Sequence, residues 1–164
     1  MNLRRRAGGF TLIEMIVTVT LVGILLTIAV PSFWKLILNQ GIKTASYDIF
    51  AAMEYARSEA IKTNGPVSIR AGASTDGAWT TGWRVVNASS TVLRSWSAAS
   101  NLSITETANS GATVITFGPD GRVTSPAASP RIQLDPAATE SGVSTRCVGV
   151  DLIGRPITRM GACS

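Results

Sequence analysis

The chain opens with a long run of apolar residues, and a segment of mixed polarity with helical spacing follows. Between Met15 and Trp34 there are 20 residues without a charge, and Lys35 ends the run. At about 1.5 Å per residue, such a helix is about 30 Å long, the thickness of a bilayer's hydrocarbon core. We expect a membrane-spanning helix here. A buried core helix and the uncleaved signal anchor of an unrelated protein are the alternatives.

The next segment, residues 35–63, has the pattern of an amphipathic helix. Its apolar residues recur every three or four positions and form one stripe: Leu38, Ile42, Ala45, Ile49, Met53, Ala56 and Ala60. Asn64-Gly65-Pro66 ends the pattern, because glycine favours the left-handed cap and proline cannot continue a helix. The sequence therefore predicts one helix from about Phe10 to Thr63, with a kink expected near Pro31.

After Pro66 the pattern changes to short runs typical of β-strands, separated by turn residues. The expected strands are Val67 to Ala71, Gly82 to Asn87, Thr91 to Ser97, Leu102 to Thr107, Thr113 to Phe117, Arg131 to Leu134, Arg146 to Ile153 and Ile157 to Met160. Small-residue loops are expected at 125–129 and 136–144. The pattern predicts an α+β fold in which an antiparallel sheet or sandwich packs against the helix. Trp79, Trp83 and Trp96 are expected to pack in its interior.

Much of the net positive charge lies ahead of the apolar run. The chain has 15 Lys and Arg residues against 10 Asp and Glu residues, and three of the basic residues are Arg4, Arg5 and Arg6. Without this leader the net charge falls to +2, so the basicity is mainly a topogenic signal that predicts a cytoplasmic N-terminus. The chain has no histidine, no nucleophile elbow and no phosphate-binding loop. We expect no enzyme activity, no cofactor and no metal site.

Two cysteines, Cys147 and Cys163, lie near the C-terminus. An even cysteine count in an exported chain favours a disulfide, whereas a catalytic or zinc site would need partners that are missing.

The position of the glycines and of one carboxylate sharpens the interpretation of the N-terminus. An ordinary signal peptide is cut after its apolar core, whereas Gly8 and Gly9 precede it. Cleavage between Gly9 and Phe10 would free an amine at Phe10, one helical turn from Glu14. In a filament the same carboxylate could meet the amine of a neighbouring subunit. The alternative is an interfacial glutamate that reaches water.

Gly8-Gly9-Phe10-Thr11-Leu12-Ile13-Glu14 resembles the processing site of type IV prepilins and type II secretion pseudopilins. The resemblance implies that a prepilin peptidase cuts after Gly9 and methylates the Phe10 amine. It also implies that Glu14 is the assembly residue and that Pro31 distorts the helix.

The second half adds to this resemblance through three segments that occur in the expected order. Tyr55-Ala56-Arg57-Ser58-Glu59-Ala60, Gly82-Trp83-Arg84-Val85-Val86 and Phe117-Gly118-Pro119-Asp120-Gly121-Arg122 are similar to the GspH/FimT-like group of minor pilins and pseudopilins. The resemblance implies a β-rich head and a low-copy subunit near the filament tip.

Arg146, Arg155 and Arg159 form a small basic cluster near the C-terminus, opposed there only by Asp151. Arg155 and Arg159 share parity, so an extended strand would place both on one face, where they could bind DNA phosphates. Some FimT-like pilins that capture DNA have a Gly-Arg-x-Arg tail, and the spacing from Gly154 to Arg159 departs from it. Ordinary surface arginines with roles in subunit contacts are the alternative.

Together these features predict a minor pilin or pseudopilin with four parts. They are a removed leader (1–9), the transmembrane half of the helix (10–34), its amphipathic half (35–63), and a β-rich head with a disulfide-closed loop (64–164). The expected role is assembly or priming of a type IV pilus or type II secretion pseudopilus, and DNA binding for transformation is the alternative. The expected location is the inner membrane, single-pass with a periplasmic head, and then the filament. Expected partners are other pilin subunits, the prepilin peptidase, the assembly platform, the lipid bilayer and, in the alternative, DNA.

Overall fold

The computed structural model describes residues 10–98, 100–151 and 153–164, so Gly8 and Gly9 lie outside the described residues. Helix α1 (Leu12–Thr63) extends over 52 residues and ends at the predicted position. The chain divides into two compact units, residues 1–35 and 36–164, and each is described by itself.

In the first unit α1 exposes apolar side chains all round. The helix is long and apolar enough to cross a membrane, and none of its most apolar 18-residue window is buried. Three threonine hydroxyls donate to helix carbonyls within this segment: Thr18 to Met15, Thr20 to Ile16 and Thr27 to Ile24, at 2.7–2.9 Å. These bonds satisfy hydroxyl groups that would otherwise be costly in lipid.

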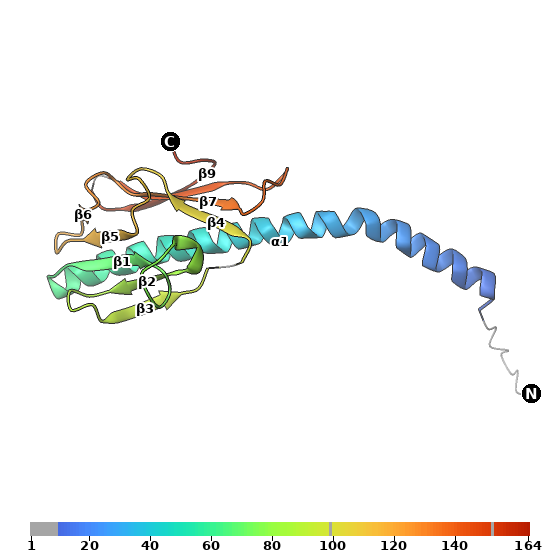
Figure 1. Cartoon of the computed structure of the whole chain (residues 1–164), viewed down its shortest axis with the longest axis horizontal. Helices are drawn as coiled ribbons and strands as arrows, with labels where there is room; N and C mark the ends of the chain where they lie inside the picture. Colours follow the sequence, from blue (N-terminus) through green and yellow to red (C-terminus); the bar gives the residue numbers. More distant parts are fainter. Residues whose placement is uncertain (1–9, 99, 152) are drawn as a thin grey trace, which may run out of the picture. The chain divides into compact units, whose positions relative to one another are not determined.

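In the second unit, the C-terminal part of α1 packs against two antiparallel sheets (Figure 1). The predicted stripe is confirmed, since all seven of its residues are buried, together with Ser46 and Ala52. The four alanines on this face let the sheets approach the helix closely, because an alanine side chain adds little width. The strands are β1 (Val67–Ala71), β2 (Trp83–Val86), β3 (Val92–Trp96), β4 (Leu102–Glu106), β5 (Val114–Phe117), β6 (Val123–Ser125), β7 (Arg131–Pro136), β8 (Arg146–Val150) and β9 (Pro156–Met160), with a short 3-10 helix at Trp79–Thr81.

One sheet has the strand order β3-β2-β1-β5-β6 and the other β4-β7-β8-β9. Side chains from both sheets and from α1 form one core, in which Trp83, Phe117 and Ile42 are among the largest fully buried groups. Trp79 is also buried, and its indole N–H donates to the carbonyl of Ala112 at 2.9 Å. Trp96 is partly buried against the same core.

All eight predicted strands are found, β1 with the predicted ends and the other seven with somewhat different ones, and β6 was missed. β6 is only three residues long and contains Thr124 and Ser125, so it offers almost no alternation of apolar and polar positions. The predicted strand from Arg146 to Ile153 ends earlier, at Val150, because the chain then turns and the Gly154 N–H donates to the Asp151 carbonyl.

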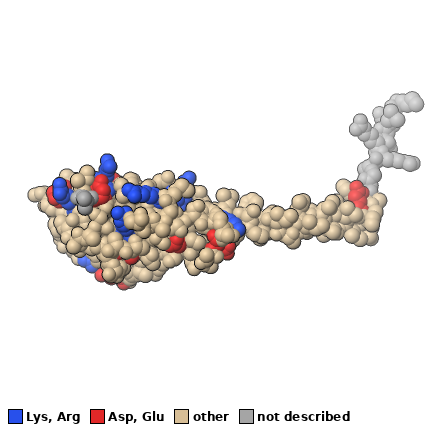
Figure 2. Space-filling model, turned by 90° about the horizontal axis from the view of Figure 1, so that it is seen from above, with Lys and Arg blue, Asp and Glu red and all other residues tan. Residues whose placement is uncertain are grey.

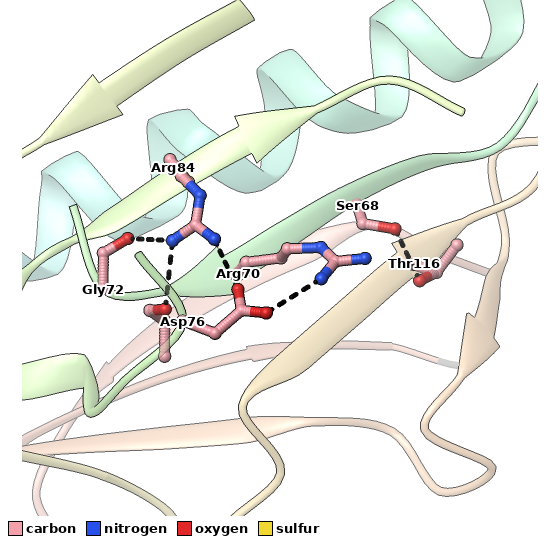
Figure 3. Close-up of polar contacts among 7 residues, drawn as sticks. Ser68, Arg70, Gly72, Asp76, Arg84 and Thr116 are labelled. Carbon is pink, nitrogen blue, oxygen red and sulfur yellow. Dashed lines mark hydrogen bonds and ion pairs between the residues drawn. The ribbon is translucent and has the colours of Figure 1, made fainter. Parts of the chain in front are cut away.

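Two arginines are direct cross-strand partners on the five-stranded sheet, an arrangement that would be repulsive without a counter-charge. Arg70 lies opposite Arg84, and Asp76 forms an ion pair with each of them (Figure 3). Arg84 is buried and also donates to the carbonyl of Gly72 at 2.7 Å. One carboxylate thus bridges the pair, offsets part of its charge and anchors the loop after β1.

Glu106 is a buried carboxylate, 5% exposed, that organises the loop after β4. It accepts hydrogen bonds from the backbone N–H groups of Ala108, Asn109, Ala112 and Arg131, and from the Asn109 side-chain amide, at 2.8–3.3 Å. Burial raises the pKa of Glu106, but the bonds from Asn109, Arg131 and Ala108 outweigh burial, so the pKa lies below its ordinary value. The charged carboxylate therefore stabilises the folded state.

We expect Glu106→Gln to lower the free energy of unfolding by about 2 kcal/mol near neutral pH, since an amide would place N–H groups against backbone donors. Because the folded-state pKa is depressed, this contribution is present above the unfolded-state pKa of about 4.3 and is lost as the pH falls through the lower folded-state value. Urea unfolding of the detergent-solubilised chain, followed by tryptophan fluorescence, measures the difference. Glu140→Gln is the control, because the Glu140 side chain has no hydrogen bond or ion pair among the described residues. An equal stability loss in both variants would contradict this role for Glu106.

Candidate assembly site

Thr11 and Glu14 form a capping box at the start of α1. The Glu14 backbone N–H donates to the Thr11 hydroxyl at 3.3 Å, and the Thr11 backbone N–H donates to the Glu14 carboxylate at 3.5 Å. Each side chain therefore satisfies a backbone donor that a helix N-terminus leaves unpaired. The signal, Thr-x-x-Glu ahead of an apolar run, was present in the sequence but was missed, because Glu14 was considered only as a charge.

The structure places Phe10 and Glu14 on exposed surface at the same helix end. In the unprocessed chain the Phe10 nitrogen belongs to the peptide bond with Gly9, so it carries no positive charge. A pairing of Glu14 with the Phe10 amine therefore requires cleavage. The predicted assembly role of both residues remains a prediction.

Pro31 lies inside α1, and the helix continues through it. Proline has no N–H, so the carbonyl of Thr27 lacks the usual bond from four residues ahead. The predicted kink at Pro31 remains a prediction.

At the other end of the chain, Cys147 and Cys163 form the predicted disulfide, with Cα atoms 5.1 Å apart. The backbone N–H of Cys163 also donates to the Gln133 side chain at 3.1 Å. These two links fasten the C-terminal segment to β7 and β8.

The strand register separates the three arginines of the predicted DNA site. Arg146 pairs with Leu134 and Met160, and Leu134 is in the core, so Arg146 lies on the core-facing side of the sheet. Arg159 pairs with Cys147 and lies on the outer side. The expectation that Arg146, Arg155 and Arg159 form one cluster is thus corrected by the register of β8 and β9.

Arg155 lies just before β9 rather than within it. Its guanidinium is 3.6 Å from the Asp151 carboxylate, and its backbone N–H donates to that carboxylate at 2.7 Å. Arg155 and Arg159 are separated by an even number of positions, so the alternation of side chains places Arg155 on the same outer side as Arg159. Arg131 belongs to the same outer surface, because its side chain packs next to Gly149, 3.5 Å from where a Cβ of that residue would be.

The outer surface of the four-stranded sheet therefore carries Arg131, Arg155 and Arg159. Figure 2, which looks at the head from the side of β7 and β9, shows Lys and Arg side chains gathered on this face. Acidic groups lie among them: Asp151 pairs with Arg155, and Asp135 is hydrogen-bonded to Thr145 and Gln133.

Comparison with known families identifies both parts of the chain. The family model described as type II transport protein GspH matches residues 45–154, and the model of the prokaryotic N-terminal methylation motif matches residues 4–30. The chain belongs to the GspH family. No curated protein sequence matches it significantly.

Two solved structures share the fold. The type IV minor pilin FimU of Pseudomonas aeruginosa is 25% identical, with a TM-score of 0.59 over 72% of this chain and 87% of that one. The minor pseudopilin EpsH of the Vibrio cholerae type 2 secretion system is 14% identical, with a TM-score of 0.52 over 74% and 96%. These findings confirm the resemblance and the pilin-like fold.

Two of the segments that carried the resemblance to GspH proteins lie in contact. Gly121, in the turn after β5, fits directly against α1: a Cβ there would be 2.7 Å from the Ile61 side chain and 3.1 Å from the Arg57 guanidinium. On its other side, a Cβ at Gly154 would be 2.0 Å from the Gly121 carbonyl oxygen. Both glycines have a positive φ, 74° at Gly121 and 84° at Gly154, and a Cβ at Gly154 would collide with backbone, so glycine is favoured in both turns. The turn after β5 thus lies between the helix end and the turn before β9.

Proposed function

We propose that this chain is a minor pilin or pseudopilin subunit that takes part in the assembly or priming of a type IV pilus or type II secretion pseudopilus. The observation that carries the proposal is a helical segment that exposes apolar side chains all round and leads into a head domain of the GspH family. Such a surface needs lipid or other apolar helices around it.

In this proposal the helix is used twice. A prepilin peptidase cuts the chain between Gly9 and Phe10 on the cytoplasmic side and methylates the new amine. Residues 10–34 hold the subunit in the inner membrane with the head in the periplasm. An assembly platform then moves the same segment from lipid into a bundle of neighbouring pilin helices.

Glu14 sets the register of the bundle. A carboxylate near an apolar segment is costly, and the capping box lowers this cost by giving it a backbone N–H. Its position at the helix N-terminus also places it near the positive end of the helix dipole. During assembly the carboxylate pairs with the Phe10 amine of an adjacent subunit, which exchanges a neutral donor for a charged one.

Two substitutions of Glu14 separate its role as a helix cap from its role as a charged group. Glu14→Gln keeps the capping-box geometry and removes the charge, whereas Glu14→Ala removes both. We expect both variants to be processed and both to enter filaments roughly tenfold to a hundredfold less, since a charge-assisted bond is lost. Immunoblots of sheared filaments and of membranes measure entry and processing. If Glu14→Gln entered filaments like the wild type, the ionic role would be wrong and only capping would remain.

A second candidate function is DNA binding for uptake. It is favoured by the outer surface of the four-stranded sheet, where Arg131, Arg155 and Arg159 lie on one side. Guanidinium groups on a regular sheet surface suit phosphates, and affinity would then depend strongly on salt.

Arg146 is a matched control for the proposed DNA binding, because the register of β7 and β8 places it on the opposite side of the same sheet. In a gel shift at low salt with the detergent-solubilised chain, Arg155→Ala/Arg159→Ala should weaken binding and reduce the slope of log affinity against log salt by about 0.7 to 0.9 per lost contact. Arg146→Ala should change neither. Absence of binding by the wild type at low salt would exclude this function, and equal loss in both variants would place the contact elsewhere.

A further inference from the structure

The head unit has an apolar groove beside the first turns of its helix. It has a volume of about 570 Å³ and lies between α1 and the residues around the ends of β2 and β3. One wall is formed by Leu36, Ile37, Gln40, Gly41, Thr44 and Asp48 of α1. The other includes Trp83 and Ser97. Leu36 and Ile37 are 63% and 57% exposed, so the groove has an apolar rim that the subunit leaves open to solvent.

Gly41 lies in the middle of this wall, and the contacts of its own chain do not explain it. Glycine inside a helix is less favourable than alanine, because it gives up more backbone freedom. Among the described residues, a Cβ at this position would meet only the Leu102 side chain, at an ordinary distance of 4.0 Å. Alanine would therefore fit the isolated subunit. A glycine that packing within the chain does not require is what a second helix backbone needs for close approach.

Two polar groups on the groove walls are poorly satisfied in the single subunit. Trp83 is 1% exposed, and its indole N–H has no acceptor among the described residues. Burial raises the pKa of Asp48 above its ordinary value, and Arg94 lowers it only in part. Arg94 forms no ion pair with Asp48 within 4.0 Å and lies instead over the Trp96 ring, 5.0 Å from its centroid. An apolar partner offers neither an acceptor for Trp83 nor a counter-charge for Asp48, so the choice of partner rests on the apolar rim and on Gly41.

We propose that this groove receives an apolar α-helix of a neighbouring pilin-type subunit, which crosses α1 at Gly41. The inference rests on the proposed function and extends it by assigning one contact between subunits. Two observations select a helix as occupant. Leu36 and Ile37 directly follow the apolar segment that needs helical neighbours, and Gly41 allows the short distance of about 8 Å between helix axes that small residues permit.

The first test is a photo-crosslink in cells that make filaments. A benzophenone-bearing residue replaces Gln40 or Thr44 in the full chain, and Ala51, which is exposed on α1 but does not line the groove, is the control position. We expect positions 40 and 44 to crosslink to the N-terminal helix of another subunit, as identified by mass spectrometry. Crosslinks only to head-domain peptides, only to lipid, or at Ala51 alone would overturn the inference.

The second test uses the size of residue 41. Gly41→Ala should leave the melting temperature of the detergent-solubilised full chain unchanged or raise it, yet it should lower the crosslink at Thr44. Gly41→Leu should lower that crosslink roughly tenfold, because added bulk blocks the approach of the second backbone. Ala51→Leu adds the same side chain on exposed helix surface and should have no such effect. A normal crosslink in Gly41→Leu would overturn the inference.

The two proposals fail in different ways. If the wild type is recovered in filaments but positions 40 and 44 give no crosslink to a helix, the groove contact is wrong and the assembly function stands. If the wild type is absent from filaments while other pilins are present, the assembly function is wrong and the groove contact falls with it.

Discussion

One constraint underlies the whole molecule: a single helix has to satisfy two different surroundings. Residues 36–63 bury one stripe and can rely on the head, so their other faces carry polar groups such as Lys43 and Glu59. Residues 12–34 expose apolar side chains on every face, and no described part of their own unit covers them. The threonine hydroxyls in this segment bond back to the helix, so it presents almost no unsatisfied polar group to its surroundings. The head is therefore stable by its own packing, whereas the N-terminal segment depends on other molecules.

Two carboxylates organise the loops of the head. Glu106 is buried and accepts hydrogen bonds from backbone N–H groups of the loop after β4 and of β7, which replace the water it lost and make burial of its charge tolerable. Asp76 is exposed and bridges two arginines that face each other across strands. These groups fix the loops at the edges of the sheets. Gly121 brings the turn after β5 against the helix end, and Gly154 brings the turn before β9 against Gly121.

The sequence was sufficient to predict which side chains are buried where the spacing of apolar residues follows the helical period. It was insufficient where the pairing of strands decides which side of a sheet a residue faces. The stripe from Leu38 to Ala60 predicted the buried face of α1, because helical geometry fixes which residues share a face. The position of Arg146 could not be predicted in this way, since the side of a sheet depends on the register between strands. Arg146 lies opposite Met160, and Arg159 lies opposite Cys147, so two arginines that looked like neighbours have opposite orientations. The capping box of Thr11 and Glu14 was readable from the sequence, because it depends only on local spacing.

Glu14 and Gly41 illustrate the same principle at two points of one helix. Each departs from what would best suit an isolated subunit: a carboxylate beside an apolar segment and a glycine inside a helix. The capping box reduces the first cost without removing it, because its N–H donors are neutral and exposed. No contact of the described residues offsets the second, since an alanine methyl would fit against them. In the proposed assembly both departures become favourable, because Glu14 meets a free amine and Gly41 admits the backbone of a second helix. The proposed function thus gives a physical reason for two residues that packing within the described chain does not explain.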